Sequence, residues 1–225
     1  MWVSEVFCSV QGEGLHMGVP SAFLRTSGCN LRCWFCDTPY TSWNPEGDEV
    51  SLDAVVEQLT GYGVEHVVIT GGEPVLVPEV VPLTRELKRR GHYITIETAG
   101  TVHRDLKADL ISLSPKLANS VPVGTNWEQR HEQRRHRPEV IQRWLDSFSC
   151  QFKFVVDVPE DLAEIDAYVA AFPEIDPRQV FLMPQGTEIE ILRGKLPWLE
   201  DLAAARGWQV APRLHIELFG NTRGT

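Results

Sequence analysis

The sequence lacks a long apolar run, a basic leader and an excess of cationic side chains. No apolar stretch approaches the length of a membrane span, and residues 1–7 lack the charged start of a secretory signal. The chain has 21 Lys and Arg against 31 Asp and Glu, a formal net charge of −10. We therefore expect neither a membrane protein nor one that binds nucleic acid. There is also no internal repeat or low-complexity linker, so residues 1–225 are expected to form a single domain.

Cysteine is scarce and odd in number, which argues against a framework of disulfides. Three of the five cysteines, Cys29, Cys33 and Cys36, fall within eight residues at C-x3-C-x2-C spacing. Such a group predicts a metal site in a reducing compartment, for which we take the cytoplasm. Cys8 and Cys150 lie far from this group in the sequence, and we expect them to be core residues.

The cysteine-bearing stretch 28–38, called the cluster loop below, also lacks a fourth ligand. No His or further Cys follows Cys36 closely. A structural zinc site and a closed electron-transfer cluster each need four protein ligands. Three thiolates instead suit a 4Fe–4S cluster that leaves one iron open to a ligand other than protein.

Short apolar strands alternate with helical segments along most of the chain. We expect strands at 5–10, 21–26, 66–70, 93–98, 109–113, 151–156 and 179–183, and helices at 52–60, 77–90, 139–146, 160–171 and 189–206. Nearly continuous apolar strands are typical of parallel sheets buried on both faces. Six βα-like units predict an α/β fold, an incomplete barrel of parallel strands too short for eight units.

The alternation lapses between about residues 117 and 138, where a basic run interrupts an acidic protein. Its cationic side chains are Arg130, His131, Arg134, Arg135, His136 and Arg137. No interleaved aromatic residues or binding motif accompany them, so we interpret the segment as a solvated, mobile insertion rather than a nucleic-acid site.

Polar motifs follow several of the predicted strands. Gly71-Gly72-Glu73-Pro74 follows the strand at 66–70, Glu97 ends the next, and Ser114 and Lys116 come after the strand at 109–113. Parallel barrels place their chemistry at the carboxyl ends of strands, so we expect these residues to share one site with the cluster loop.

The cluster loop and the Gly-Gly-Glu-Pro motif together resemble the radical S-adenosylmethionine (SAM) superfamily, in which C-x3-C-x-aromatic-C precedes Gly-Gly-Glu-Pro at the second strand. The resemblance implies a 4Fe–4S cluster on Cys29, Cys33 and Cys36, with SAM on the open iron. The residues it implies for SAM binding are Phe35, Gly71, Gly72, Glu73, Glu97, Ser114, Lys116 and Gln185. Glu73 would bind the SAM ammonium or anchor its own loop, and Glu97 would accept the ribose hydroxyls.

A narrower resemblance, to the 7-carboxy-7-deazaguanine synthase family, runs from the first strand to the tail. It rests on the segments 7–14 and 114–117, on Arg25 and on the tail that contains His215. It implies a (β6/α3) barrel that contracts the ring of 6-carboxy-5,6,7,8-tetrahydropterin with loss of ammonia, starting at C6, on the route to queuosine and other deazapurines. The implied substrate contacts are Gln11, Gly12, Glu13, Arg25, Thr70, Gly72 and His215.

The same resemblance implies a magnesium ion on the Thr38 hydroxyl, with Asp37 as a rival ligand, a homodimer, and an external one-electron donor of flavodoxin or ferredoxin type. No side chain is required as a hydrogen donor. Two other functions stay open: an activase that places a glycyl radical on a partner enzyme, and an iron–sulfur electron carrier without catalysis.

Overall fold

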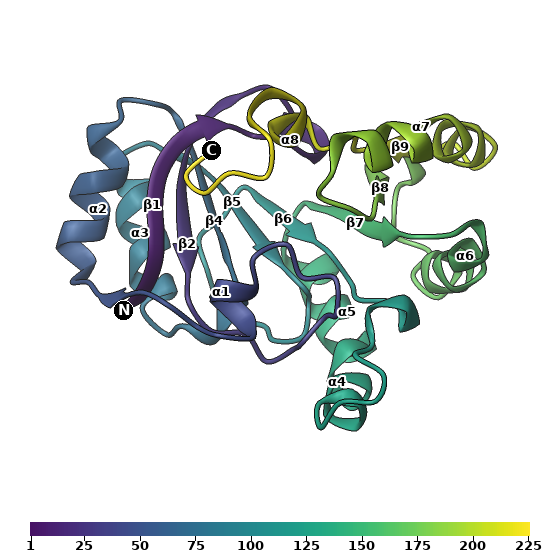
Figure 1. The fold of residues 1–225 in the computed structure, drawn as a ribbon. Helices are drawn as coiled ribbons and strands as arrows, with labels where there is room; N and C mark the ends of the chain where they lie inside the picture. The colour runs from purple at the N-terminus through teal and green to yellow at the C-terminus, as the bar shows by residue number, and fades with distance from the viewer.

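The computed structural model describes residues 1–225, which are built around one open, nine-stranded sheet (Figure 1). The strand order is β3 (Asp48–Glu49), β1 (Trp2–Val10), β2 (Pro20–Thr26), β4 (His66–Gly71), β5 (Tyr93–Thr98), β6 (Leu110–Leu113), β7 (Cys150–Val156), β8 (Val180–Pro184) and β9 (Gln209–Val210). Every neighbouring pair from β2 across to β9 is parallel, whereas β1 runs antiparallel to β2 and β3. The predicted α/β fold, an incomplete barrel of parallel strands, is confirmed.

Eight α-helices accompany the sheet. They are α1 (Pro39–Ser42), α2 (Leu52–Gly61), α3 (Val80–Arg89), α4 (Glu128–Arg135), α5 (Pro138–Ser147), α6 (Leu162–Ala170), α7 (Ile189–Ala204) and α8 (Leu214–Phe219). The longer helices α2, α3, α5, α6 and α7 lie outside the curved sheet, while α1, α8 and the C-terminal tail lie on its inner side (Figure 1). No helix combines the length and the apolar character that a membrane span requires.

Alternation along the parallel strands separates the core from the site. Ile94 and Ile96 of β5, and Phe152 and Phe154 of β7, belong to a buried apolar cluster of 36 residues. Successive side chains of a strand point to opposite faces of the sheet. Lys153, which lies between Phe152 and Phe154, therefore points to the inner face. The fold therefore carries its polar groups on the concave side of the sheet.

All five predicted helices are present as α2, α3, α5, α6 and α7, with shifted ends. Ser51 is the N-cap of α2, as its sequence predicts, and its Oγ accepts a hydrogen bond from the Ala54 amide at 3.3 Å. The helix expected from residue 77 begins only at Val80, because Pro74–Leu76 forms a separate 3₁₀ turn and Val77 is extended before Pro78. Helix α8 lies within the tail, where the sequence suggested no helix.

The segment at about 117–138, predicted to be a solvated, mobile insertion, is largely exposed to solvent but is also anchored to the rest of the chain. The segment contains α4, and the side chain of His131 on that helix is completely buried. Its Nδ1 accepts a hydrogen bond from the Arg32 amide at 3.0 Å, and its Nε2 lies 2.9 Å from the Ser120 hydroxyl. The segment is therefore packed against the cluster loop, a contact between residues about 100 apart that local composition does not reveal.

Candidate active site

A cavity of about 280 Å³ opens at the carboxyl ends of the parallel strands. Every predicted site residue except Glu73 lines it: Gln11, Gly12, Glu13, Arg25, Cys29, Cys33, Phe35, Cys36, Thr38, Thr70, Gly71, Gly72, Glu97, Ser114, Lys116, Gln185 and His215. The volume is close to that of small-molecule sites. Residues predicted for the site from segments spread along the whole chain therefore share one cavity.

The cluster loop connects β2 to α1 and is held by its own backbone and by neighbouring side chains. The Gly28 amide donates to the Thr41 carbonyl at 2.8 Å, and Trp43 Nε1 donates to the Cys33 carbonyl at 2.9 Å. Gly28 has a φ of +102°, a left-handed conformation that favours glycine at this turn. These contacts present all three cysteines to the cavity.

The three cysteines fit an iron–sulfur cluster. They line the cavity without converging on a site for a single metal ion, and in a 4Fe–4S cluster each thiolate binds a different iron. Burial raises the pKa of the Cys29 and Cys33 thiols to about 12, so thiolates there need the positive charge of bound iron. The Ser42 hydroxyl lies 3.1 Å from Cys36 Sγ and can donate to it.

Gly71 and Gly72 are required by the close approach of backbone segments. The Gly72 amide donates to the Thr26 carbonyl at 3.1 Å, and a Cβ added to Gly72 would lie 2.2 Å from the Gly28 carbonyl oxygen and 2.7 Å from that of Thr41. The two glycines are thus packed directly on the cluster loop, and both also line the cavity.

Replacing Gly72 with alanine is expected to lower the free energy of unfolding by about 1–3 kcal/mol, because two backbone segments would have to move apart. Thermal or denaturant unfolding measures this. Gly61→Ala is the matched control, since nothing lies within 4 Å of a Cβ at that helical position. Equal stability of the Gly72 and Gly61 variants would contradict the packing role.

Glu73 lies behind the cavity wall instead of in it. One carboxylate oxygen accepts from the Val75 amide at 3.1 Å and the Thr98 hydroxyl at 2.7 Å, and the other accepts from the Ala99 amide at 2.9 Å. The side chain is fully buried. Of the two roles suggested for Glu73, this arrangement supports the anchor that joins the end of β4 to the end of β5.

Glu97, at the end of β5, is fixed by three donors from three different elements. Its oxygens accept from Thr70 Oγ1 at 2.9 Å, Lys153 Nζ at 3.0 Å and Gln11 Nε2 at 3.3 Å. A carboxylate has about four acceptor positions. The three donors therefore fix the orientation of the Glu97 carboxylate and leave about one acceptor position free toward the cavity.

Lys153 joins Glu97 to Glu13 and is the most buried charge in the site. Only 3% of Lys153 is exposed, and its Nζ lies 2.8 Å from Glu13 Oε2. Burial lowers the pKa of Lys153, but the two carboxylates outweigh it and hold that pKa above its ordinary value. Burial likewise raises the pKa of Glu13, yet Lys153 and Arg213 keep it well below its ordinary value. Glu13 and Lys153 are therefore both charged at neutral pH.

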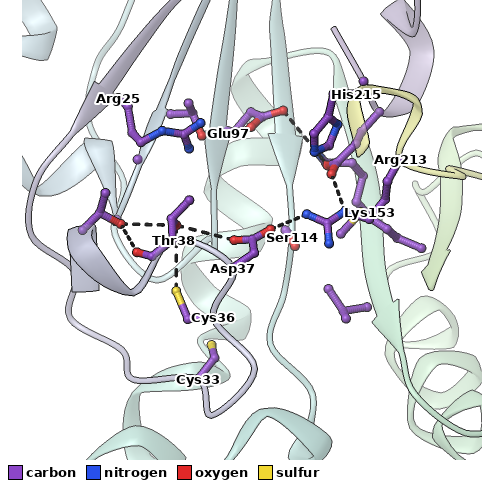
Figure 2. A pocket seen from close by; sticks show the side chains of 18 of the residues that line it. Arg25, Cys33, Cys36, Asp37, Thr38, Glu97, Ser114, Lys153, Arg213 and His215 are labelled. Carbon is purple, nitrogen blue, oxygen red and sulfur yellow. Dashed lines mark hydrogen bonds and ion pairs between the residues drawn. The ribbon is translucent and has the colours of Figure 1, made fainter. Parts of the chain in front are cut away.

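A chain of contacts leads from this charged group back to the cluster loop (Figure 2). Arg213 donates from Nε to Glu13 Oε1 at 3.2 Å and from Nη2 to the Asp37 carboxylate. Asp37 Oδ1 lies 3.5 Å from Thr38 Oγ1, which lies 3.8 Å from Cys36 Sγ. One Asp37 oxygen is thus held by Arg213, while the other faces the Thr38 hydroxyl.

The opposite wall is made by the first two strands and the tail. Arg25 donates from Nε to Glu5 Oε2 at 3.1 Å and has no protein hydrogen bond from its two terminal nitrogens. The Leu214 amide donates to the Gly12 carbonyl at 2.9 Å, and a Cβ on Gly12 would meet His215 Nδ1 at 1.9 Å. Burial lowers the pKa of His215, which favours a neutral ring beside the cavity.

Ser114, Lys116 and Gln185 complete the rim. Lys116 Nζ donates to the Ser114 hydroxyl at 2.7 Å and to the Ser114 carbonyl at 2.6 Å. The Gln185 amide donates to the Val156 carbonyl at 2.8 Å, which holds this residue at the end of β8. All three line the cavity.

Sequence reasoning missed Lys153 and Arg213. A single lysine between two phenylalanines of an apolar strand was the available signal for Lys153, because a lysine is seldom buried without a partner. Arg213 is the one non-glycine residue with a positive φ, +66°. No local sequence pattern predicts its place in the site. Four residues of the tail were not predicted either, although they line the cavity: Asn221, Thr222, Arg223 and Thr225.

Comparison with known proteins agrees with this site. Residues 23–149 match the model of the radical SAM superfamily. The chain is 46% identical to the 7-carboxy-7-deazaguanine synthase of Rhodopirellula baltica, over 99% of this chain and 88% of that protein, and 40% identical to that of Halobacterium salinarum, over 99% and 92%. The crystal structure of QueE from Escherichia coli superposes with a TM-score of 0.70 at 27% identity, over 93% of this chain and 92% of that one. The chain therefore belongs to the 7-carboxy-7-deazaguanine synthase family of the radical SAM superfamily.

Proposed function

We propose that this enzyme converts 6-carboxy-5,6,7,8-tetrahydropterin to 7-carboxy-7-deazaguanine with loss of ammonia. The observation that carries the proposal is that one cavity joins the three cysteines and Glu97 to a polar set on the opposite wall, Arg25, Glu13 and His215. The first group suits SAM and a cluster. The second suits a small heterocycle that carries a carboxylate.

The proposed cofactor roles follow from the donors present. When bound, the 4Fe–4S cluster and SAM supply the 5′-deoxyadenosyl radical that starts the ring contraction. Cys29, Cys33 and Cys36 would hold the cluster. Glu97 is already fixed by Thr70, Gln11 and Lys153, which leaves about one of its four acceptor positions. It would therefore accept one ribose hydroxyl in its present orientation, and the second hydroxyl only by displacing one of these donors. Gly71 and Gly72 would expose backbone carbonyls to the SAM ammonium, with Glu73 holding their loop.

The proposed substrate contacts use groups whose charges are fixed. The free terminal nitrogens of Arg25 suit a carboxylate. Glu13 stays ionised beside Lys153 and Arg213, and its remaining acceptor positions suit the N–H groups of the pterin edge. His215, with a lowered pKa, can accept or donate one hydrogen bond as a neutral ring. These residues bind and orient the substrate, and none is required to transfer a proton.

We also propose a magnesium ion at Thr38, where its hydroxyl and a substrate carboxylate would supply hard oxygen ligands. Thr38→Val keeps the shape of the side chain and removes the oxygen. We expect it to raise the Mg²⁺ concentration needed for half-maximal activity by about tenfold or more. Titration of activity with MgCl₂ measures this. An unchanged Mg²⁺ requirement would exclude Thr38 as a ligand.

A homodimer and a flavodoxin- or ferredoxin-type electron donor, both implied by the family resemblance, are further parts of the proposal. So is a cytoplasmic location, which the cysteine pattern predicts.

The activity is tested with anaerobically purified, cluster-loaded enzyme, dithionite, SAM, Mg²⁺ and the carboxytetrahydropterin, with mass spectrometry of the products. We expect 7-carboxy-7-deazaguanine in molar excess over enzyme. Cleavage of SAM without that product would favour a glycyl-radical activase, and no cleavage by a fully loaded protein would favour an electron carrier.

A further inference from the structure

Arg213, between β9 and α8, has an unfavourable backbone conformation. Its φ of +66° and ψ of +59° are left-handed, and no other residue except glycine has a positive φ. A side chain with a Cβ is disfavoured in this conformation, whereas glycine adopts it readily. An arginine kept at such a turn indicates that its side chain does something that glycine cannot do.

The side chain of Arg213 is buried and contacts three segments that are distant in the sequence. Only 5% of the residue is exposed. Its Nε donates to Glu13 Oε1 at 3.2 Å, Nη1 donates to the Gly186 carbonyl at 2.6 Å, and Nη2 donates to the Asp37 carboxylate (Figure 2). Glu13 follows β1, Gly186 follows β8 and Asp37 belongs to the cluster loop. Each nitrogen of one planar group therefore holds a different part of the cavity wall.

The backbone of Arg213 begins the helix that carries His215. The Arg213 carbonyl accepts from the Ile216 amide at 2.9 Å, and the Leu214 amide donates to the Gly12 carbonyl at 2.9 Å. The first turn of α8 is thereby tied to the loop after β1, and His215 within that turn lines the cavity. Side chain and backbone of one residue thus fix α8 against the other walls.

The contacts of Arg213 require a guanidinium group. Asp37 has no other ion pair, and Glu13 has one more, with Lys153 at 2.8 Å. A lysine ammonium is a compact charge without the planar fork of arginine, so it could not reach three acceptors on three segments at once.

We propose that Arg213 is a positioning residue for the substrate, which holds α8, the loop after β1 and the cluster loop in the arrangement that binds the pterin. This inference rests on the proposed function, in which Glu13 and His215 contact the pterin and Thr38, beside Asp37, binds magnesium. Arg213 acts through these residues and needs no contact of its own with the substrate.

The cluster and SAM should bind without Arg213. None of its three acceptors is a cysteine or Glu97. The cluster loop is also held by Trp43 and by His131, neither of which contacts Arg213. Loss of the side chain should therefore affect the pterin far more than the cofactors.

The test begins with Arg213→Gly, which removes the side chain where glycine suits the backbone, so that the protein should still fold. The Asp37 side chain is 40% exposed and can be solvated, and Glu13 keeps Lys153. We expect the Kd of the carboxytetrahydropterin, measured by anaerobic calorimetry, and its KM to rise by about tenfold or more. Bound iron and the Kd of SAM should change much less. An arginine that only stabilised the fold would instead lower kcat with the amount of folded protein, at unchanged KM.

Chemical rescue separates the charge of the side chain from the space that it fills. Guanidinium chloride at millimolar concentration should restore the pterin affinity of Arg213→Gly severalfold, whereas urea, which is planar but uncharged, and NaCl should not. Arg213→Lys should bind the pterin about as weakly as Arg213→Gly does. Guanidinium that restored no more affinity than urea would overturn the proposal, as would Arg213→Lys protein with the affinity of the wild type.

Arg206→Gly is the matched control. Arg206 also bonds to a carboxylate and a backbone carbonyl, Asp166 at 2.7 Å and Leu202 at 3.1 Å, but it lies outside the cavity. We expect it to bind the pterin as the wild type does. Unchanged pterin affinity in Arg213→Gly, or an equal loss in both glycine variants, would contradict the positioning role.

Hydrogen exchange of the unliganded protein keeps this test separate from the proposed function. The amides of α8 should exchange faster in Arg213→Gly than in the wild type, and guanidinium should slow them again. Equal exchange in the two proteins would overturn the inference that Arg213 holds this helix. Failure of the wild type to turn over the pterin would count against the proposed function, while hydrogen exchange would still decide whether Arg213 holds α8.

Discussion

Replacing Cys33 with serine is expected to abolish cleavage of SAM while leaving the fold intact. Cys33 is buried and lines the cavity, and its thiol is one of the three protein ligands proposed for the cluster. Loss of a residue that merely supports a metal ligand costs about 10–100-fold, so loss of a ligand should cost more than about 100-fold. The readouts are bound iron and sulfide per chain and the yield of 5′-deoxyadenosine.

The fold should survive because the loop is anchored independently of metal, through Trp43 Nε1 on the Cys33 carbonyl and His131 on the Arg32 amide. Cys8→Ser is the control, since that thiol is exposed on β1. The expectation that Cys8 is a core residue is therefore wrong, whereas Cys150 is buried as predicted. We expect the Cys8 variant to bind iron and cleave SAM normally. If Cys33→Ser kept the iron and activity of the wild type, the assignment of this loop would be wrong.

Replacing Lys153 with methionine is expected to lower the free energy of unfolding by about 2–3 kcal/mol, because it leaves the half-buried carboxylates of Glu13 and Glu97 without their shared cation. The control is Lys88→Met, which breaks a pair with Asp109 at 2.8 Å that is open to solvent. That change should lower the free energy of unfolding by less than about 1 kcal/mol. Denaturant unfolding of the three proteins measures the difference.

The pH dependence of the same variants gives an independent check. The pKa of Glu13 is lowered in the folded state, so its stabilising contribution is present above its ordinary value of 4.5 and is lost as the pH falls below it. The pKa of Lys153 is raised, so its contribution is complete below its ordinary value of 10.5 and is lost as the pH rises above it. The stability difference between wild type and Lys153→Met should therefore be largest between those values. A difference that did not change with pH would contradict the ionic role of Lys153.

Lys153 also connects the two halves of the proposed site. Its Nζ contacts Glu13, on the proposed substrate side, and Glu97, on the proposed SAM side. We expect folded Lys153→Met protein to bind both SAM and the pterin more weakly than the wild type does. Lys88→Met should bind both as the wild type does.

The sequence predicted what depends on local spacing and on strand ends. The three cysteines, the two glycines of the Gly-Gly-Glu-Pro motif at the end of β4 and the carboxylate at the end of β5 all line the cavity, because parallel strands bring their carboxyl ends to one edge. Ser51 was likewise found as the cap of α2, since a cap is a contact within four residues.

What the sequence could not predict depends on contacts between distant segments. Arg213 reaches Glu13 across 200 positions and Asp37 across 176. His131 was counted as part of a basic run, and only the packing of α4 shows that its ring is buried against Arg32. The sequence places Gly72 in the site but does not show why a glycine is needed there, because the nearest obstacle to a side chain is the backbone of the distant Gly28.

The most direct test of the central claim is turnover of a carboxytetrahydropterin that carries deuterium at C6, with cluster-loaded enzyme, SAM, Mg²⁺ and dithionite. Mass spectrometry should find 7-carboxy-7-deazaguanine together with deuterium in SAM or 5′-deoxyadenosine, because the reaction is proposed to begin by hydrogen removal from C6. Formation of 5′-deoxyadenosine that contains no deuterium, with the pterin recovered unchanged, would contradict the claim that this cavity brings the two molecules together for reaction.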